Sequence, residues 1–238
     1  MLLQNFFCQR LIGQRNDSAQ TVASYRDTFC LLLRYLSRHI NKSPDQLILT
    51  DLDAPLILCF LDYLEQERGN AVRSRNNRLA AIRSFMHYTS FQNPTCLTMV
   101  QRVLAIPMKR FERPLLDYLS REEMQAIIHA PDSSTWSGHR DRVLFATLYN
   151  TGARVSEIIN LHVDHLSLDR RFFIKIQGKG RKQRAVHLWK STIRLIRQWL
   201  CRISNAPDTP LFPNRTGKPL TRSWVEKRLR LELREAPK

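Results

Sequence analysis

The chain has 238 residues, 43% of them hydrophobic and only seven of them glycine, which suits one large domain or two modest ones and excludes a disordered protein. Lysine and arginine outnumber aspartate and glutamate by 38 to 21, and the resulting +17 indicates a polyanionic partner. No apolar run approaches the roughly 20 residues that span a bilayer. The start resembles no signal peptide, and the five cysteines form no C-x-x-C pair. We therefore expect a cytoplasmic protein with buried free thiols and no membrane partner.

The first half of the chain predicts a helical bundle. Apolar residues recur at spacings of three and four through residues 18–40, with Ser18 as a candidate N-cap. Further helices are predicted in "APLILCFLDYLEQERG", with Asp53 as a cap, in "SRNNRLAAIRSFMHYTS" and in "LTMVQRVLAI". We expect residues 1–107 to form a compact helical domain. Basic residues gather in or beside the first turns of its third helix: Arg73, Arg75, Arg78 and Arg83.

A charged segment closed by prolines, "PMKRFERP", separates this half from the next. Proline disfavours helix on either side of itself, so residues 108–116 are predicted to be a linker. Lys109 and Arg110 suit a strap that lies along a phosphate backbone.

Residues 117–238 predict a second domain that mixes helices with a small antiparallel sheet. Ser120 and Glu123 have the spacing of a capping box, and a helix near 139–149 ends at Gly152. Arg154 then precedes the short apolar "VSEIINL" helix, where we expect its charge to be buried and paired. The period changes to two in "RFFIKIQ" and "RAVHL", which flank the basic turn "GKGRK", and two more helices follow. The fold class is thus mainly α with a small antiparallel β-sheet.

Two motifs in this second domain occur in a specific order. T-G-x-R-x-S-E opens the short helix, and G-K-G-x-K-x-R forms the hairpin turn that follows it. A basic hairpin alone is weak evidence, because many surface hairpins are basic; the ordered pair is far more specific.

With these motifs the sequence resembles the tyrosine recombinases, or phage integrases, and most of all their Xer-like and insertion-element-associated branch. "TGARVSEIINLHVDHLSL" and "IQGKGRKQRAVHL" match that family's first catalytic box and its hairpin, and "TVASYRDTFCLLLRYL" and "NNRLAAIRSFMHY" are similar to its core-binding domain. The resemblance covers essentially the whole chain. It implies a helical SAM-like core-binding domain followed by a partial α+β DNA breaking-rejoining catalytic domain.

The resemblance also implies roles for single residues. Arg154 matches the first catalytic arginine, which grips the nonbridging oxygens of the scissile phosphate, and Glu157 matches the acidic position that supports it. Lys179 matches the hairpin lysine, the general acid for the departing 5′ oxygen. A plainer alternative is that Arg154 pairs with Glu157 and does nothing else. The expected DNA contacts are Arg73, Arg75, Arg78, Arg83, Lys109, Arg110, Arg181, Lys182 and Arg184.

The sequence departs from the family pattern after the hairpin. The family continues with an H-x-x-R box, a second His or Trp position and a nucleophilic tyrosine. These 238 residues have no tyrosine beyond Tyr149 and only His187 after the hairpin. We therefore expect a C-terminally truncated recombinase that cleaves no strand alone. Its partial catalytic domain should be marginally stable, with apolar surface exposed at Leu229, Leu231 and Leu233.

Three other interpretations stay open: a module that occupies recombination sites, a non-functional remnant of a mobile element, and a domain completed from another reading frame. The expected partner is double-stranded DNA, with no cofactor and no small-molecule ligand. The family forms homo-oligomers on paired sites through its C-terminal region, so assembly by this chain is an open question. His162 and His165 have a spacing seen in metal sites, but four ligands are not at hand, and we expect no metal.

Overall fold

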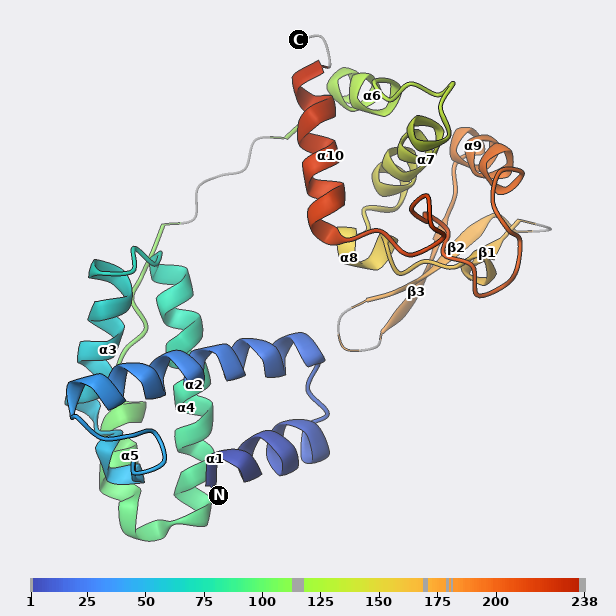
Figure 1. Ribbon diagram of the computed structural model, residues 1–238. Coiled ribbons are helices and arrows are strands. Elements are labelled where there is room, and N and C mark those ends of the chain that lie inside the picture. Colours follow the sequence, from blue (N-terminus) through green and yellow to red (C-terminus); the bar gives the residue numbers. More distant parts are fainter. Residues whose placement is uncertain (1, 113–117, 169–170, 179, 181, 236–238) are drawn as a thin grey trace. The chain divides into compact units, whose positions relative to one another are not determined.

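The computed structural model describes residues 2–112, 118–168, 171–178, 180 and 182–235, with side chains up to residue 233. The chain divides into two compact units, Met1–Leu115 and Leu116–Lys238, and each is described by itself (Figure 1). The first is helical, and the second combines helices with a three-stranded antiparallel sheet. The predicted fold class is confirmed. Among the described residues, no helix is both long and apolar enough to cross a membrane.

Unit 1 is a bundle of helices, and two of them, α2 and α3, start at the predicted caps. Ser18 accepts a hydrogen bond from the Thr21 N–H at the start of α2, and Asp53 accepts one from the Leu56 N–H at the start of α3. The described elements are α1 (Leu2–Asn5), the π-helix η1 (Phe6–Gln14), α2 (Ala19–His39), η2 (Leu49–Asp51), α3 (Ala54–Gln66), α4 (Val72–Gln92), η3 (Pro94–Cys96) and α5 (Leu97–Leu104).

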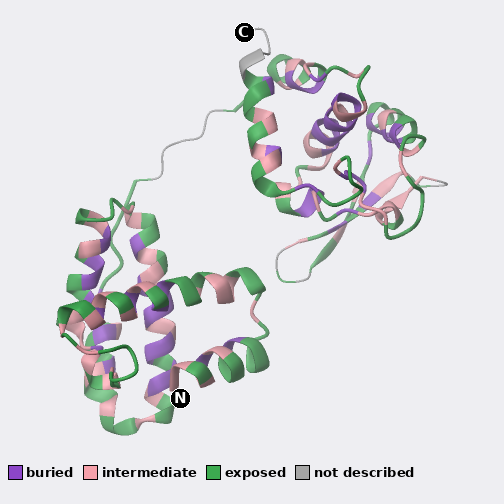
Figure 2. Cartoon of the chain, viewed as in Figure 1, coloured by how far each residue is buried: buried purple, intermediate pink, exposed green. Residues whose placement is uncertain are grey.

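The core of unit 1 forms where α2, α3 and α4 turn their apolar sides inward (Figure 2). Phe6 is fully buried, and its ring meets those of Phe29 and Phe85 edge-on at centroid distances of 6.2 and 5.3 Å. The cysteines take no part in this core. Cys8, Cys30, Cys59 and, in unit 2, Cys201 are exposed and Cys96 is half-buried, so the expectation of buried thiols is wrong. Cys8, Cys30 and Cys59 lie on the exposed faces of η1, α2 and α3, whose other faces contribute Phe6, Phe29 and Phe60 to the core.

Unit 2 begins with the predicted capping box. The Ser120 hydroxyl accepts a hydrogen bond from the Glu123 N–H, and the Glu123 carboxylate accepts one from the Ser120 N–H. The described elements are α6 (Arg121–His129), α7 (Trp136–Thr151), α8 (Val155–Ile158), η4 (Val163–His165), β1 (Leu166–Ser167), β2 (Phe173–Gln177), β3 (Gln183–His187), α9 (Lys190–Leu200) and α10 (Arg222–Glu235).

The sheet of unit 2 contains the predicted hairpin. Strands β2 and β3 pair antiparallel from Phe173 opposite His187 to Gln177 opposite Gln183, and the two-residue β1 pairs with the other edge of β2. Ile174 and Ile176 are fully buried, so alternate residues of β2 anchor the sheet in the core and leave the turn outside it.

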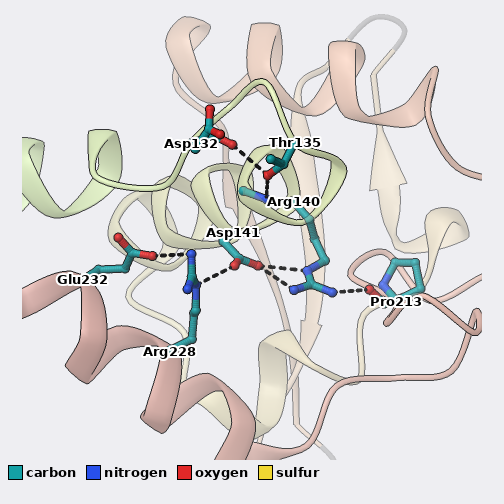
Figure 3. A network of polar contacts seen from close by, with 8 residues as sticks. Asp132, Thr135, Arg140, Asp141, Pro213, Arg228 and Glu232 are labelled. Carbon is teal, nitrogen blue, oxygen red and sulfur yellow. Dashed lines mark hydrogen bonds and ion pairs between the residues drawn. The ribbon is translucent and has the colours of Figure 1, made fainter. Parts of the chain in front are cut away.

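A buried ionic network ties α7 to α10 and was not anticipated (Figure 3). Asp141, 1% exposed, accepts hydrogen bonds from Arg140 at 2.9 and 2.8 Å and from Arg228 at 2.9 Å. Arg140 also donates to the Pro213 carbonyl oxygen at 3.0 Å and stacks over Trp224, 4.4 Å from the ring centroid. The network therefore joins the centre of unit 2 to its last helix and to the loop before that helix.

The last helix leaves part of its apolar surface open. Leu231 and Leu233 are 37% and 44% exposed, as predicted, whereas Leu229 is half-buried against the unit 2 core. The prediction is therefore right for two of its three leucines. Leu229 lies one helical turn after the buried Val225 and shares its inward face.

Candidate functional site

Arg154 lies at the junction between α7 and α8. Gly152 ends α7 with φ at +58°, a conformation that suits glycine, and Arg154 is the extended N-cap residue of α8. Its side chain is 70% exposed, so the expectation of a buried arginine is wrong. An N-cap residue stands outside the helical turn, and α8 buries its apolar face without covering that side chain. The guanidinium is thus open to an external anion.

Glu157 holds Arg154 in place from inside the protein. Its carboxylate is 5% exposed and accepts hydrogen bonds from the Arg154 N–H at 3.0 Å and from Arg154 Nη1 at 2.9 Å. A third bond, at 2.7 Å, comes from Nη2 of Arg184 on β3. The hydrogen bond from Arg184, followed by those from Arg154, outweighs the effect of burial and lowers the pKa of Glu157 to about 2. Glu157 is accordingly a carboxylate at any ordinary pH, and two guanidiniums share it.

The start of the β2–β3 turn lies against this ion pair. A Cβ atom added to Gly178 would lie 3.3 Å from Nη1 of Arg184 and 3.4 Å from Oε1 of Glu157. The Gly178 N–H donates to the Lys182 carbonyl oxygen at 2.7 Å, which closes the turn, and the Lys182 side chain is exposed. Lys179 and Arg181 lie outside the described residues. The structure thus brings together Arg154, Glu157, Arg184 and Gly178, the residue before Lys179 in the sequence.

The predicted basic residues of unit 1 fall into two groups. Arg73 and Arg110 are exposed, and Lys109 is largely exposed while its Nζ contacts Glu65 Oε2 at 2.5 Å. Arg83 is half-buried. Arg78 is also half-buried, and burial, followed by the charge of Arg68, lowers its pKa.

Arg75 differs from the expectation of a DNA contact. Its side chain is 3% exposed, and Nη1 donates to the Pro107 carbonyl oxygen at 3.3 Å and to Asn76 Oδ1 at 3.2 Å. Its Nε lies 3.6 Å from Glu65 Oε1. These contacts tie α4 to the chain after α5, so Arg75 is a structural residue, and the surface that a phosphate would need is covered.

The sequence interpretation missed two further groups. Arg10 and Arg15 line a surface hollow of about 360 Å³ together with Arg83 and His87. The polar residues in and just after η1 follow no periodic pattern that would predict this position for the two arginines. Arg140 and Asp141 are buried together in α7. The sequence carries a signal for this pair: three charges in a row, Arg140, Asp141 and Arg142, directly precede the largely apolar stretch "VLFATL", and a carboxylate is buried there only when it is paired.

The histidine pair has a local structural role. Nδ1 of His165 accepts the His162 N–H at 3.1 Å, and this bond closes the η4 turn. In the part of the chain that the structure describes, no group of three or more His, Cys, Asp and Glu side chains could hold a metal ion.

Comparison with protein-family models gives two matches, one in each unit. The model described as the phage integrase family matches residues 117–236, and the model described as the phage integrase N-terminal SAM-like domain matches residues 5–92. Together they span most of the chain in the same order as the two units.

Relatives with curated names agree with these matches. The putative integrase/recombinase y4rC of Sinorhizobium fredii is 45% identical over 94% of this chain and 68% of that protein. The putative integrase/recombinase y4rD of the same organism is 39% identical over 93% of this chain and 80% of that protein. The tyrosine recombinase XerD of Pseudomonas putida is 28% identical over 97% of this chain and 75% of that protein.

Solved structures share the fold at lower identity. The XerH site-specific recombinase in a post-cleavage complex with its palindromic difH substrate is similar with a TM-score of 0.70 and 23% identity, over 93% of this chain. A lambda integrase (75–356) dimer bound to a COC′ core site also gives 0.70, at 14% identity, over 99% of this chain and 80% of that one. The chain spans 64% of the XerH chain, less than two thirds of its length.

Proposed function

The chain belongs to the phage integrase family, and from this premise we propose that it binds duplex DNA at a recombination site and grips a backbone phosphate with Arg154. The observation that carries the proposal is the state of that side chain: its guanidinium is 70% exposed, yet a buried carboxylate 2.9 Å away holds it in one orientation. A guanidinium fork matches two phosphate oxygens, and one held in position loses little entropy on binding. The net charge of +17 adds a long-range attraction to DNA.

Lys179 is proposed to act on the same phosphate. It stands between Gly178, which packs against the Glu157–Arg184 pair, and Gly180, which has φ at +74°. In the family that the motifs resemble, this lysine is the general acid for the departing oxygen. Further phosphate contacts are proposed for Arg73, Arg78, Arg83, Lys109, Arg110, Arg181 and Lys182, but not for the buried Arg75.

We further propose that these 238 residues alone bind DNA without cleaving it. They contain no tyrosine after Tyr149, and the resemblance assigns the nucleophile to a tyrosine beyond the hairpin. Two related proposals are that the protein assembles on paired DNA sites and that a further segment supplies the missing part of the catalytic site.

DNA binding is tested by a salt series with an oligonucleotide duplex. The logarithm of affinity should fall linearly with the logarithm of salt concentration, and Arg154→Ala should reduce that slope by about 0.9, the value for one lost phosphate contact. The matched control is Arg222→Ala, which removes an exposed arginine that pairs with Glu226 one turn later on the same helix. Its loss should leave the slope within error. If the slope of affinity against salt were the same in Arg154→Ala as in the wild type, the proposed phosphate contact of Arg154 would be contradicted.

Cleavage is tested separately, with a suicide substrate nicked near the target phosphate. The expected result is no protein–DNA adduct that survives denaturant. An adduct formed by these 238 residues would refute the proposed lack of cleavage and leave DNA binding untouched. Limited proteolysis then compares the binding module with the inactive remnant: a protected fragment ending near residue 107 supports the module, and complete digestion supports the remnant.

A further inference from the structure

Arg184 was expected to contact DNA, but its side chain is engaged within the protein. It stands on β3 opposite Ile176 of β2, and its Nη2 donates to Oε2 of Glu157 at 2.7 Å. Its side chain is 39% exposed, against 70% for Arg154 on the same carboxylate. Of the two cations, Arg154 presents the more accessible guanidinium, and Arg184 makes the shorter bond.

The contact joins two elements, α8 and β3, that are separated in the chain by η4, β1, β2 and the turn after β2. Glu157 belongs to α8, which positions Arg154, and Arg184 belongs to the strand that leaves the turn. Gly178, where the turn begins, lies against both partners, since an added Cβ would meet Nη1 of Arg184 at 3.3 Å and Oε1 of Glu157 at 3.4 Å. The start of the turn therefore packs against α8, whose N-cap residue is Arg154, at this ion pair.

The strength of the contact follows from its surroundings. The bond from Arg184 is the largest cause of the low pKa of Glu157, and that carboxylate is 5% exposed. Water cannot replace a lost donor easily at such a site, because the oxygen is already out of reach of solvent.

We propose that Arg184 is a positioning residue: by holding Glu157 from the returning strand, it fixes the base of the cationic turn beside Arg154. Arg154 and the two described ends of the turn, Gly178 and Lys182, then meet the DNA as one preorganised unit, and Arg184 itself makes no phosphate contact. This inference rests on the proposed function for its consequence on DNA, but the docking of the turn stands on the contacts alone.

A salt series with four variants distinguishes positioning from direct contact. Arg184→Ala should weaken duplex binding by roughly two- to thirtyfold, the range for coupling through a neighbouring group, while the slope of affinity against salt stays that of the wild type. Arg184→Lys should recover part of the loss. Lys182→Ala, which removes an exposed cation next to the same turn, should lower the slope by about 0.9. Arg194→Ala removes an exposed arginine of α9, outside the hairpin and α8, and should change neither quantity.

A slope for Arg184→Ala that falls as far as that of Lys182→Ala overturns the proposal, because Arg184 would then be a phosphate contact. Failure of the proposed function looks different: the affinity of the wild type would not depend on salt, or Arg154→Ala would keep the slope of the wild type.

Two measurements without DNA test the docking of the turn directly. In Arg184→Ala the Glu157 carboxyl, followed by NMR, should titrate with a pKa above about 2. The Gly178 amide, which donates to the Lys182 carbonyl oxygen, should exchange faster with solvent, while the amide of the buried Ile174 near the start of β2 should not. Unchanged Glu157 titration and unchanged Gly178 exchange would overturn the proposal even if DNA binding were lost. Tryptophan fluorescence shows whether each variant has folded, since all four tryptophans lie in unit 2.

Discussion

Replacing Asp141 by Asn should destabilise unit 2 by about 3–5 kcal/mol, the cost of breaking a buried ion pair from one side. The carboxylate is 1% exposed and accepts three hydrogen bonds from two arginines. In the variant, one neutral amide oxygen would replace the two carboxylate oxygens that the arginines share. Arg140, itself 2% exposed, would keep the Pro213 carbonyl oxygen and the faces of nearby tryptophans but lose its ion pair. A domain of this size has a total stability of roughly 6–18 kcal/mol, so the loss is a large share of it.

The four tryptophans make the assay selective. Trp136, Trp189, Trp199 and Trp224 all belong to unit 2, so fluorescence in a urea series follows unit 2 alone. Far-UV circular dichroism also follows the helices of unit 1, which serve as an internal reference. The fluorescence midpoint should fall in Asp141→Asn, and the unit 1 transition should not move.

The matched control breaks an exposed ion pair of the same chemistry. Arg222→Gln removes the pair with Glu226 on α10, whose side chains are 74% and 44% exposed, and should cost at most about 0.5 kcal/mol. If Asp141→Asn leaves unit 2 unfolded without urea, Arg228→Gln provides a milder break, because that arginine is 32% exposed. A loss of less than about 1 kcal/mol in Asp141→Asn, no larger than in the control, would refute the account of the network.

Two further predictions concern unit 2. Gly138→Ala should prevent the folding of unit 2, because the added Cβ would overlap the Asp132 carbonyl oxygen. In Gly152→Ala the added Cβ meets open space, so the variant should lose only about 1 kcal/mol of stability, because alanine is strained at the positive φ of that position. Equal losses of stability in urea unfolding of the two variants would contradict this prediction. Glu157→Gln should flatten the acid response of unit 2. The lowered pKa of Glu157 gives stability that is complete above about pH 4.5 and is lost as the pH falls toward 2, so the free energies of unfolding of wild type and variant should converge over that range. A constant difference between them would count against the carboxylate's role.

Much of the fold could be predicted from the sequence because its signals are local. Helix starts at Ser18, Asp53 and Ser120 follow from side chains that bond the next turn, and the hairpin follows from the change of period to two around a glycine-flanked turn. The two-residue strand β1 carries too short a pattern to be recognised, and it exists because β2 offers it an edge.

The candidate site was predicted only in part, because exposure and pairing depend on tertiary contacts. The motifs placed Arg154 and Glu157 one helical turn apart, and the structure adds that the carboxylate is buried and the guanidinium is not. Nothing local indicates that Arg184 reaches back to Glu157 or that Arg75 turns inward to the Pro107 carbonyl oxygen. Both contacts join segments that the chain brings together only after it folds.

The sharing of one carboxylate by two guanidiniums fixes the electrical state of the site. Guanidinium groups keep their proton throughout the range in which proteins are handled, and Glu157 gains one only near pH 2. From mild acid to mild alkali the trio of Arg154, Glu157 and Arg184 therefore carries the same single positive charge. Any change of DNA affinity with pH in this range must originate in other groups, and the histidines are the first candidates.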